Sequence, residues 1–417
     1  MDRAKPFDIS KQVVWGAYQR VRANRGAAGV DGQSLGMFEK DLKSQLYKVW
    51  NRMSSGSYFP SPVRLVEIPK GKGGKRPLGI PTVADRVAQT VARMYLEPEV
   101  ERRFHEDSYG ARPGRSAHDA VGVARRRCWR RDWVIDLDIR NFFGSLDHDL
   151  LMRAVRFHTQ LQWIPLYVER WLCAAVQRED GSCVECTRGV PQGGPLSPLL
   201  ANLFMHYAFD EWMRREYPHI EFERYLDDVV VHCATEEEAR EVLDAIESRL
   251  GQCGLVLHPE KTKIVYCQDS DRKGKYPNVQ FDFLGYRFQP RRARNRYGKF
   301  FVSFLPAVSP SAANRIRAII RSWRIPGTRN NQSLEDLAAL LDPYVRGWMN
   351  YYGRFYRSKM VQVLRYVNDV LVRWVLRKYR RFRRKERRAA HWLGRIAARD
   401  PQVLALWQLG IKPAAGR

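Results

Sequence analysis

Long apolar runs are missing from this 417-residue chain. None approaches the roughly 20 consecutive residues that a helix needs to cross a bilayer. The first seven residues, MDRAKPF, contain no hydrophobic core of a secretory signal. The sequence therefore predicts a cytoplasmic protein without a membrane partner.

Cysteine is scarce, with 7 irregularly spaced residues. An odd number without regular spacing does not indicate a disulfide framework, so reduced thiols are expected. Cys183 and Cys186 have the spacing of half a zinc site. No second Cys or His pair lies at the spacing of a zinc finger, so the support for zinc is weak.

Acidic residues are few in the last third of the chain. Residues 291–417 contain 29 Lys and Arg against 6 Asp and Glu. Of the totals of 72 and 45, this leaves 43 against 39 for the first 290 residues, in a chain of net charge +27. A basic face releases counterions from phosphates, so the last third is predicted to bind nucleic acid in a salt-dependent way.

A disordered tail or a membrane-surface helix is the alternative interpretation of such a basic region. Its apolar residues, however, recur at helical spacing and form one stripe with arginines at its edges, which favours a folded helix. The stripe consists of Val363, Leu364, Val367, Val370, Leu371, Trp374 and Val375.

Two short segments place carboxylates beside residues that favour strands. Residues 224–232 read RYLDDVVVH, and residues 133–143 read WVIDLDIRNFF. Val and Tyr favour strands whereas Asp favours turns, so a β-hairpin with Asp227 and Asp228 at its tip is predicted. A solvated turn would explain an Asp pair alone, but the two segments together form a rarer pattern.

Clustered carboxylates have a chemical consequence. When held a few Å apart they raise each other's pKa unless a cation neutralises them. Mg²⁺ prefers oxygen ligands and also binds phosphates. The pattern therefore predicts two-metal phosphoryl or nucleotidyl transfer.

These segments resemble the palm of reverse transcriptases, specifically those of group II introns. Further blocks follow in the family's order over nearly the whole chain, which makes the resemblance specific. They are Gly29–Gly32, Ile68–Pro81, Ser108–His118, Gly189–Asn202, His258–Lys263, Phe281–Phe288 and Gly347–Tyr352.

The resemblance implies an α+β right-hand polymerase fold. Fingers and a palm with an antiparallel sheet would precede an all-helical, basic thumb or maturase domain. The expected domains are an N-terminal extension at 1–60, fingers and palm at 61–290, and the thumb at 291–417. Separately, the local pattern predicts a helix over Val83–Leu96 that ends before Pro98.

The resemblance assigns catalysis and metal binding to Asp138, Asp227 and Asp228, which would hold two Mg²⁺ ions. Asp136 lies on the same strand face as Asp138 and is the alternative first ligand. One ion would lower the pKa of the primer 3′-hydroxyl, and the other would hold the triphosphate of the incoming dNTP.

Substrate contacts are also implied by the resemblance. Phe143 would exclude a 2′-hydroxyl, with Phe142 beside it, and Leu284 and Gly285 would form the primer grip. The residues expected to contact the incoming nucleotide and its phosphates are Lys70, Arg76, Gln192 and Lys261. The alternatives are a buried core position for Phe143 and ordinary surface positions for the two lysines.

Three positions depart from the family pattern. Leu226 stands where Ala is usual, Gly144 where Asp is common, and Ala111 where Phe is common. None removes a catalytic carboxylate, so polymerisation is expected to survive, with an effect on primer handling or biological role. The Cys and His cluster of the family's endonuclease is missing, so target-strand cleavage is not expected.

The expected activity is that of an RNA-directed DNA polymerase that extends a DNA or RNA primer on an RNA template. As a maturase it would also bind group II intron RNA in splicing and retrohoming. Two alternatives stay open: a domesticated, free-standing enzyme of DNA repair or phage defence, and a splicing-only RNA-binding maturase. The intact aspartates argue against the second.

Overall fold

The computed structural model describes residues 5–69 and 74–414. The chain forms two compact units. The first consists of Met1–Ala124 and Trp133–Ile264, and the second of Arg125–Asp132 and Val265–Arg417. Lys70, predicted to contact the triphosphate, lies outside the described residues.

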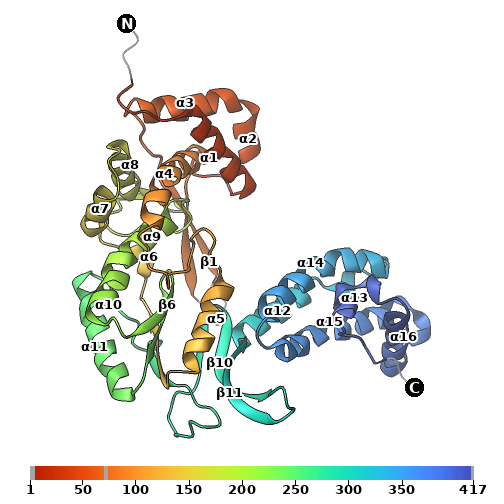
Figure 1. The fold of residues 1–417 in the computed structure, drawn as a ribbon. Coiled ribbons are helices and arrows are strands. Elements are labelled where there is room, and N and C mark those ends of the chain that lie inside the picture. Colours follow the sequence, from red (N-terminus) through yellow and green to blue (C-terminus); the bar gives the residue numbers. More distant parts are fainter. Residues whose placement is uncertain (1–4, 70–73, 415–417) are drawn as a thin grey trace. The chain divides into compact units, whose positions relative to one another are not determined.

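Three helices open the first unit: α1 (Lys11–Ala23), α2 (Leu35–Lys40) and α3 (Leu42–Ser54). The Ser10 side chain caps α1 by accepting a hydrogen bond from the backbone of Gln12. The apolar side of α1 packs against α3 and against α4 (Val83–Glu101) (Figure 1). These helices therefore share a core with helix α4.

A small sheet follows, with strand order β2-β1-β4-β5. The bounds are β1 (Val63–Pro69), β2 (Lys75–Ile80), β4 (Val176–Gln177) and β5 (Cys183–Val184). β1 pairs antiparallel with β2 and parallel with β4, so β4 and β5 extend the β1–β2 hairpin.

Helix α4 (Val83–Glu101) is longer than predicted. The expected end before Pro98 was wrong, because the helix continues through this proline. A proline inside a helix costs about 3 kcal/mol. Leu96 and Val100 on either side of it are almost completely buried, and each such burial contributes about 1.5–3 kcal/mol. Tertiary packing thus offsets the local cost.

The central sheet of the first unit has the strand order β6-β7-β3-β8. Its strands are β3 (Trp133–Asp138), β6 (Glu221–Tyr225), β7 (Asp228–Cys233) and β8 (Lys263–Tyr266). The first unit ends within β8, at Ile264. β7 pairs antiparallel with both β6 and β3. The predicted antiparallel sheet and the Asp227–Asp228 hairpin are therefore confirmed.

Helix α11 (Glu236–Gln252) packs on both β3 and β7 of the central sheet. A π-helix, η1, continues α9 and leads into α10. The bounds are α5 (Ala117–Cys128), α6 (Phe142–Ser145), α7 (His148–Phe157), α8 (Trp163–Leu172), α9 (Ser197–Met205), η1 (His206–Asp210), α10 (Glu211–Glu216) and α11 (Glu236–Gln252).

The second unit begins with a three-stranded sheet of order β11-β10-β9. Its strands are β9 (Phe281–Phe283), β10 (Tyr286–Arg294) and β11 (Phe300–Val308). The expectation of an all-helical region from residue 291 was therefore wrong. Aromatic and β-branched residues favour the strand, and Pro306 is tolerated because β11 is an edge strand.

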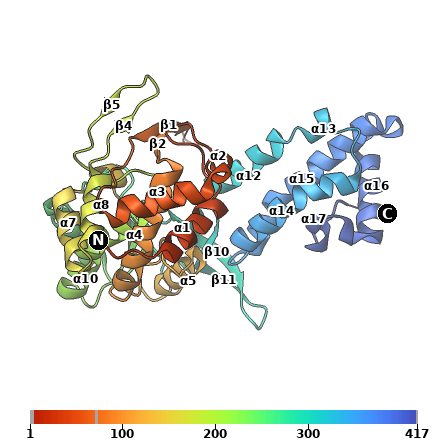
Figure 2. The same cartoon turned by 90° about the horizontal axis from the view of Figure 1, so that it is seen from above.

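Helices make up the rest of the second unit, and Figure 2 shows them as one group. The predicted apolar stripe is confirmed, because all seven of its residues are buried in α15. The bounds are α12 (Pro310–Ser322), α13 (Ile325–Thr328), α14 (Leu334–Tyr352), α15 (Arg357–Lys378), η2 (Arg380–Phe382), α16 (Glu386–Arg399), η3 (Pro401–Val403) and α17 (Ala405–Gln408).

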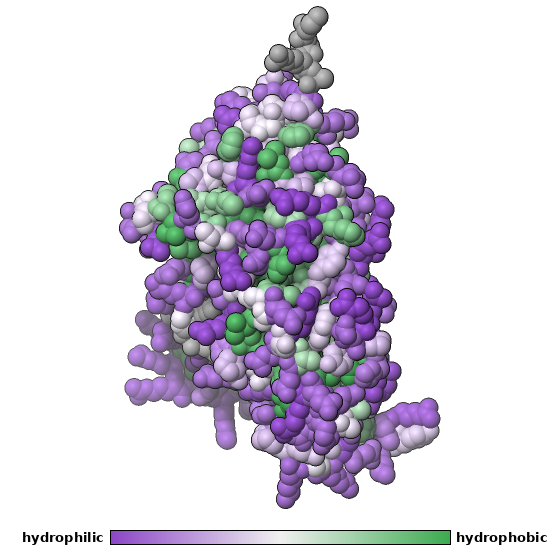
Figure 3. Space-filling model, turned by 90° about the vertical axis from the view of Figure 1, so that its left-hand side faces the viewer, coloured by the Kyte–Doolittle hydropathy of each residue, from purple (hydrophilic) through white to green (hydrophobic). Residues whose placement is uncertain are grey.

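The overall class is thus mixed α and β, as expected. Across residues 5–69 and 74–414, no helix combines the length and the apolar character needed to span a membrane. In the view of Figure 3, hydrophilic side chains cover most of the visible face, and apolar side chains form small separate groups.

Candidate functional site

The β6–β7 hairpin presents two aspartates at its tip. Asp227 lies between the strands, and Asp228 begins β7. On the neighbouring strand β3, Asp138 lies directly opposite Asp228. Residues opposite each other in an antiparallel pair have Cα atoms about 4.5–5.5 Å apart. Three carboxylate-bearing residues from two distant parts of the sequence therefore meet at one end of the sheet.

The register also separates the two candidates on β3. Asp136 lies opposite Val230, two residues further from the hairpin tip. Asp138 is the residue paired with Asp228. The geometry thus supports Asp138 over Asp136 as the partner of the hairpin carboxylates.

The electrostatic environment of Asp227 disfavours its charged form. Burial raises the pKa of this carboxyl above its ordinary value, and the nearby Asp138 raises it further, while Arg76 and Arg224 act in the opposite direction. Arg76, the residue predicted to contact the triphosphate, is therefore within electrostatic range of the predicted catalytic group. A divalent cation would favour ionised Asp227.

Lys261 lies beside Asp138, with 3.0 Å between its Nζ and the carboxylate Oδ1. The backbone of its segment is bonded to the end of β3, because the His258 N–H donates to the Asp138 carbonyl at 2.7 Å. Arg140 donates in the same way to the Val256 carbonyl. The block around Lys261 is thus held next to the first aspartate.

The carboxylates at this end of the sheet are the candidate ligands for a metal ion. In the described part of the chain, no three side chains of His, Cys, Asp or Glu are grouped closely enough to hold an ion. The residues present nevertheless fit a hard cation in chemistry: carboxylate oxygens lie at adjacent strand ends, and the pKa of Asp227 is raised partly by Asp138. Asp138 also forms an ion pair with the Lys261 ammonium group.

Arg224, to which the sequence pattern assigned no role, holds the hairpin in place. Its side chain is completely buried. It donates to both carboxylate oxygens of Asp210, at 2.7 and 2.6 Å, and to the Leu226 carbonyl at 3.1 Å. A buried charge needs such partners. A charged residue directly before Tyr225 was the sequence signal that could have indicated this role.

The same guanidinium group connects blocks that are distant in sequence. It donates to Asn202 Oδ1 at 2.9 Å and to Ser108 Oγ at 2.8 Å, and Asn202 donates to the Gly110 carbonyl. A Cβ on Gly110 would lie 2.6 Å from the backbone nitrogen of Leu226. Leu226 itself has a φ of 61°, a conformation that is uncommon for leucine.

A second set of contacts joins the predicted nucleotide-binding residues. The Val190 N–H donates to the Phe143 carbonyl at 2.7 Å, and the Gly79 N–H donates to the Gln192 carbonyl at 2.7 Å. Gly189 has a φ of 84°, and a Cβ there would lie 2.7 Å from the Phe143 carbonyl oxygen. The structure thus brings Phe143, Gln192 and strand β2 together.

The two adjacent phenylalanines differ in burial. Phe142 is 2% exposed and belongs to the core, whereas Phe143 is half-buried. Their rings meet edge to face with 5.3 Å between centroids. Phe143 is therefore the better placed of the two to contact a ligand.

Leu284 and Gly285, the predicted primer grip, form the turn between β9 and β10 in the second unit, with φ values of 51° and 79°. The Tyr351 hydroxyl donates to the Leu284 carbonyl at 2.9 Å. A Cβ on Gly285 would lie 3.1 Å from the Tyr352 hydroxyl. The turn is therefore supported from one side by tyrosines of α14.

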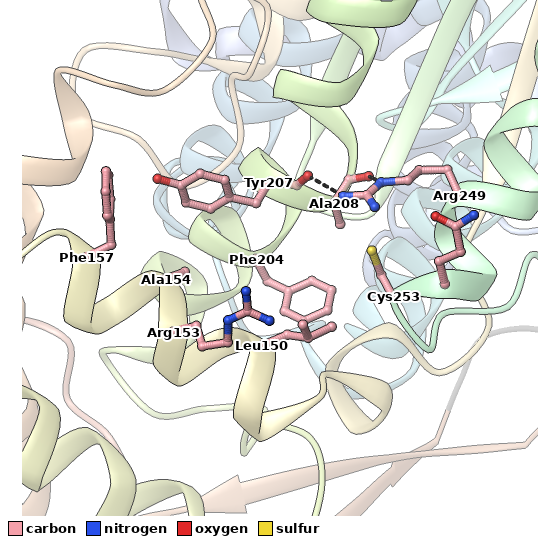
Figure 4. A pocket seen from close by; sticks show the side chains of 10 residues that line it. Leu150, Arg153, Ala154, Phe157, Phe204, Tyr207, Ala208, Arg249 and Cys253 are labelled. Carbon is pink, nitrogen blue, oxygen red and sulfur yellow. Dashed lines mark hydrogen bonds between the residues drawn. The ribbon is translucent and has the colours of Figure 1, made fainter.

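A cavity of about 510 Å³ lies elsewhere in the first unit, between α7, the α9–η1 helix and α11 (Figure 4). Arg249 closes one side by donating to the carbonyls of Tyr207 and Ala208. The described residues that line it include Arg153 and Phe157 but none of the predicted site residues. Its lining therefore does not take part in the chemistry predicted for the aspartates.

Comparison with protein families gives two matches. Residues 68–288 match the reverse transcriptase (RNA-dependent DNA polymerase) family, and residues 313–392 match the group II intron, maturase-specific domain. The first match contains the aspartates and the segments that contact them. The second lies within the helices of the second unit.

Individual relatives agree with these matches. The chain is 32% identical to protein YkfC of Escherichia coli (strain K12) over 347 residues, which cover 72% of this chain and 85% of that protein. It is 33% identical to the group II intron-encoded protein LtrA of Lactococcus lactis subsp. cremoris over 202 residues, 48% of this chain and 33% of LtrA.

A more distant similarity reaches the putative COX1/OXI3 intron 1 protein of Saccharomyces cerevisiae, at 29% identity over 47% of this chain and 23% of that protein. The family match covers the hairpin, β3 and their supporting blocks as one segment. This chain therefore belongs to the reverse transcriptase family and is an RNA-directed DNA polymerase with a group II intron maturase-specific domain.

Proposed function

We propose that this chain extends a DNA or RNA primer on an RNA template by two-Mg²⁺ addition of dNTPs, and that it binds group II intron RNA as a maturase in splicing and retrohoming. The observation that carries the proposal is the pairing of Asp138 with Asp228 beside Asp227. These three residues would hold the ions. When bound, the ions would activate the primer 3′-hydroxyl and stabilise the departing pyrophosphate.

The cationic residues have separate roles in this proposal. Arg76 contacts the triphosphate, and its charge favours ionised Asp227. Lys261, whose Nζ lies 3.0 Å from Asp138, assists the departure of pyrophosphate as a proton donor. Lys70 is assigned to the triphosphate by its place in the first fingers block alone.

Substrate selection rests on the residues around Phe143. Its half-buried ring is assigned to the sugar, where it excludes a 2′-hydroxyl and makes the substrate a dNTP. Gln192 is assigned to the underside of the incoming nucleotide, and Phe142 supports Phe143 from the core. Replacing Phe143 with Ala should relax discrimination against ribonucleotides, measured as the ratio of dNTP to NTP incorporation.

The right-hand arrangement is also part of the proposal. The N-terminal extension spans 1–60, fingers and palm span 61–290, and the thumb or maturase domain spans 291–417. The Leu284–Gly285 turn serves as the primer grip. The basic charge of the last third and its maturase-specific match at 313–392 support nucleic acid binding by this region.

Primer extension on a primed RNA template with Mg²⁺ tests the polymerase assignment. Asp227→Ala is expected to abolish dNTP incorporation while RNA affinity stays nearly unchanged. Glu237→Ala, at an exposed carboxylate on α11, is the matched control and should retain activity. Incorporation by Asp227→Ala at the control level would overturn the proposed site.

A second candidate role keeps the polymerase but separates it from an intron: a free-standing enzyme acting in DNA repair or phage defence. Leu226 supports it, because this residue stands at the hairpin tip where the family usually has Ala. The genomic flanks separate the roles, since an intron-encoded gene lies within ribozyme sequence. If the chain were a splicing-only maturase, the unmodified protein would bind RNA but would incorporate no dNTP.

A further inference from the structure

The outer half of the β10–β11 hairpin is a two-stranded ribbon. β9 pairs with residues 286–288 of β10, whereas the β10–β11 ladder continues to Arg294 and Phe300. Figures 1 and 2 both show this end of the hairpin extending from the sheet. We call residues 291–302 the ribbon tip.

The ribbon tip is strongly basic and partly apolar. It contains four arginines and one lysine, and the chain has no Asp or Glu between Asp282 and Glu335. Tyr297 is 78% exposed and Phe300 is 54% exposed, and Phe301 and Val302 are also exposed. Ser270 bonds to Val302 through its N–H and its Oγ, and the Tyr356 hydroxyl donates to the Arg292 carbonyl. The ribbon is therefore held in place while its exposed rings remain accessible to a ligand.

The register gathers cations and one ring on the same face. Arg294 pairs with Phe300, and Arg292 pairs with Val302, so these four side chains project from one side of the ribbon. The guanidinium carbon of Arg292 lies 3.8 Å from the centre of the Phe300 ring. By contrast, Arg291 on the other face donates to the carbonyls of Leu305 and Arg287 and has a structural role. Arg294 donates through Nε to the Gly298 carbonyl at 3.1 Å, so its terminal nitrogens can still meet a phosphate.

The turn at the end of the ribbon is preorganised. Asn295 Oδ1 accepts hydrogen bonds from the backbone of Tyr297 at 3.0 Å and of Lys299 at 2.9 Å. Gly298 has a φ of 83°, which glycine adopts without strain. The Arg296 guanidinium lies 4.7 Å from the centre of the Tyr297 ring. A second aromatic ring with a neighbouring cation is thus presented in a defined place.

We propose that the ribbon tip binds a single-stranded segment of RNA. Unpaired bases stack on Phe300 and Tyr297, and Arg292, Arg294 and Arg296 neutralise the adjacent phosphates. The charge fits a polyanion, and flat exposed rings fit unstacked bases, whereas a duplex would offer phosphates alone to the arginines. The assignment rests on the proposed function, because it names an RNA contact of an RNA-dependent enzyme.

Two kinds of variant separate charge from stacking. The double variant Arg292→Ser/Arg294→Ser should reduce the slope of log affinity against log salt by about 0.7 per lost phosphate contact, about 1.4 in all. Phe300→Ala and Tyr297→Ala should each weaken binding roughly 5-fold to 150-fold. Because these two changes remove no charge, the salt slope should stay at the wild-type value.

The measurement uses the full chain. Fluorescence anisotropy follows a labelled, unstructured single-stranded RNA between about 50 and 200 mM salt, in the presence of an unlabelled blunt primer–template duplex that occupies the proposed polymerase site. Lys43→Ser/Lys48→Ser removes the same charge from exposed positions of α3 and is the control. Thermal unfolding confirms that each variant remains folded.

The outcomes decide between the interpretations. An unchanged slope in the arginine variant, an equal effect of the lysine control, or neutral ring variants would overturn the proposal. Duplex RNA that competes as well as single-stranded RNA would also overturn it. Asp227→Ala should keep ribbon binding while it loses dNTP incorporation, so a failed ribbon and a failed active site give different results.

Discussion

Two hairpins of this chain place an arginine in opposite environments, one buried and one exposed. In the β6–β7 hairpin, Arg224 is completely buried and donates to a carboxylate, an amide, a hydroxyl and a backbone carbonyl. In the β10–β11 hairpin, Arg292 is exposed and packs on the Phe300 ring. Both hairpins have a residue with positive φ near the tip, Leu226 and Gly298.

The difference shows how one side-chain type serves two purposes. A buried guanidinium is stable only when all its donors are paired, so it fixes the neighbouring backbone in one arrangement. An exposed guanidinium on an aromatic ring keeps donors available for an anion. The first environment fits the proposed positioning of catalytic groups, and the second fits the proposed contact with a ligand.

The largest expected effect concerns the catalytic carboxylates. Asp138→Asn should reduce dNTP incorporation by more than about 100-fold, because loss of a metal ligand exceeds the 10-fold to 100-fold cost of losing an outer partner. Asp136→Asn is the matched comparison on the same strand face and should cost far less. A larger loss for Asp136→Asn would make it the metal ligand instead.

Breaking the buried pair should come next. Arg224→Met leaves the Asp210 carboxylate buried without its cation, which costs about 3–5 kcal/mol in the free energy of unfolding. Urea denaturation measures this loss. The double variant Arg224→Met/Asp210→Leu should recover much of it, since an apolar pair needs no compensation. Arg292→Met, on the exposed hairpin, should leave stability nearly unchanged, and an equal loss there would break the comparison.

Crowding the first hairpin should reduce activity more than stability. In Gly110→Ala the new Cβ would lie 2.6 Å from the Leu226 nitrogen, so the hairpin tip must shift. A displacement near 1 Å can cost up to about 100-fold in rate, and we expect a loss of about 10-fold or more in primer extension. Gly251→Ala, where a Cβ meets open space in α11, is the control.

The smallest effect is a pH dependence near the buried pair. Burial is the main cause that lowers the pKa of His206 below its ordinary value of 6.5, with Arg224 and His158 adding to it and Asp210 and Glu211 opposing it. The unfolded chain thus binds a proton more readily than the folded one. Stability should fall as the pH drops below about 6.5.

His206→Gln should reduce this acid sensitivity, measured as the change in the unfolding midpoint between neutral and mildly acidic pH. A variant with the same acid sensitivity as the wild type would show that other groups cause it. Arg292→Met leaves His206 in place and should therefore keep the acid sensitivity of the wild type.

Some elements could be predicted because their causes are local. The strand at β3, the Asp227–Asp228 hairpin and the apolar stripe of α15 follow from side-chain periodicity and turn residues. The end of α4 and the strand β11 were missed. Pro98 suggested a break in α4, and an all-helical region was expected where β11 lies, but burial of Val100 and the edge position of β11 make the prolines in these elements tolerable.

The candidate site likewise has features that could be predicted from the sequence and features that could not. Residue order predicted the carboxylates and correctly indicated the family, because short motifs depend on chemistry at neighbouring positions. The pairing of Asp138 with Asp228, the charge of Arg76 near Asp227 and the buried partners of Arg224 became visible only in the folded chain. These contacts join residues far apart in sequence, and which of them meet depends on how helices and strands pack, which local patterns do not encode.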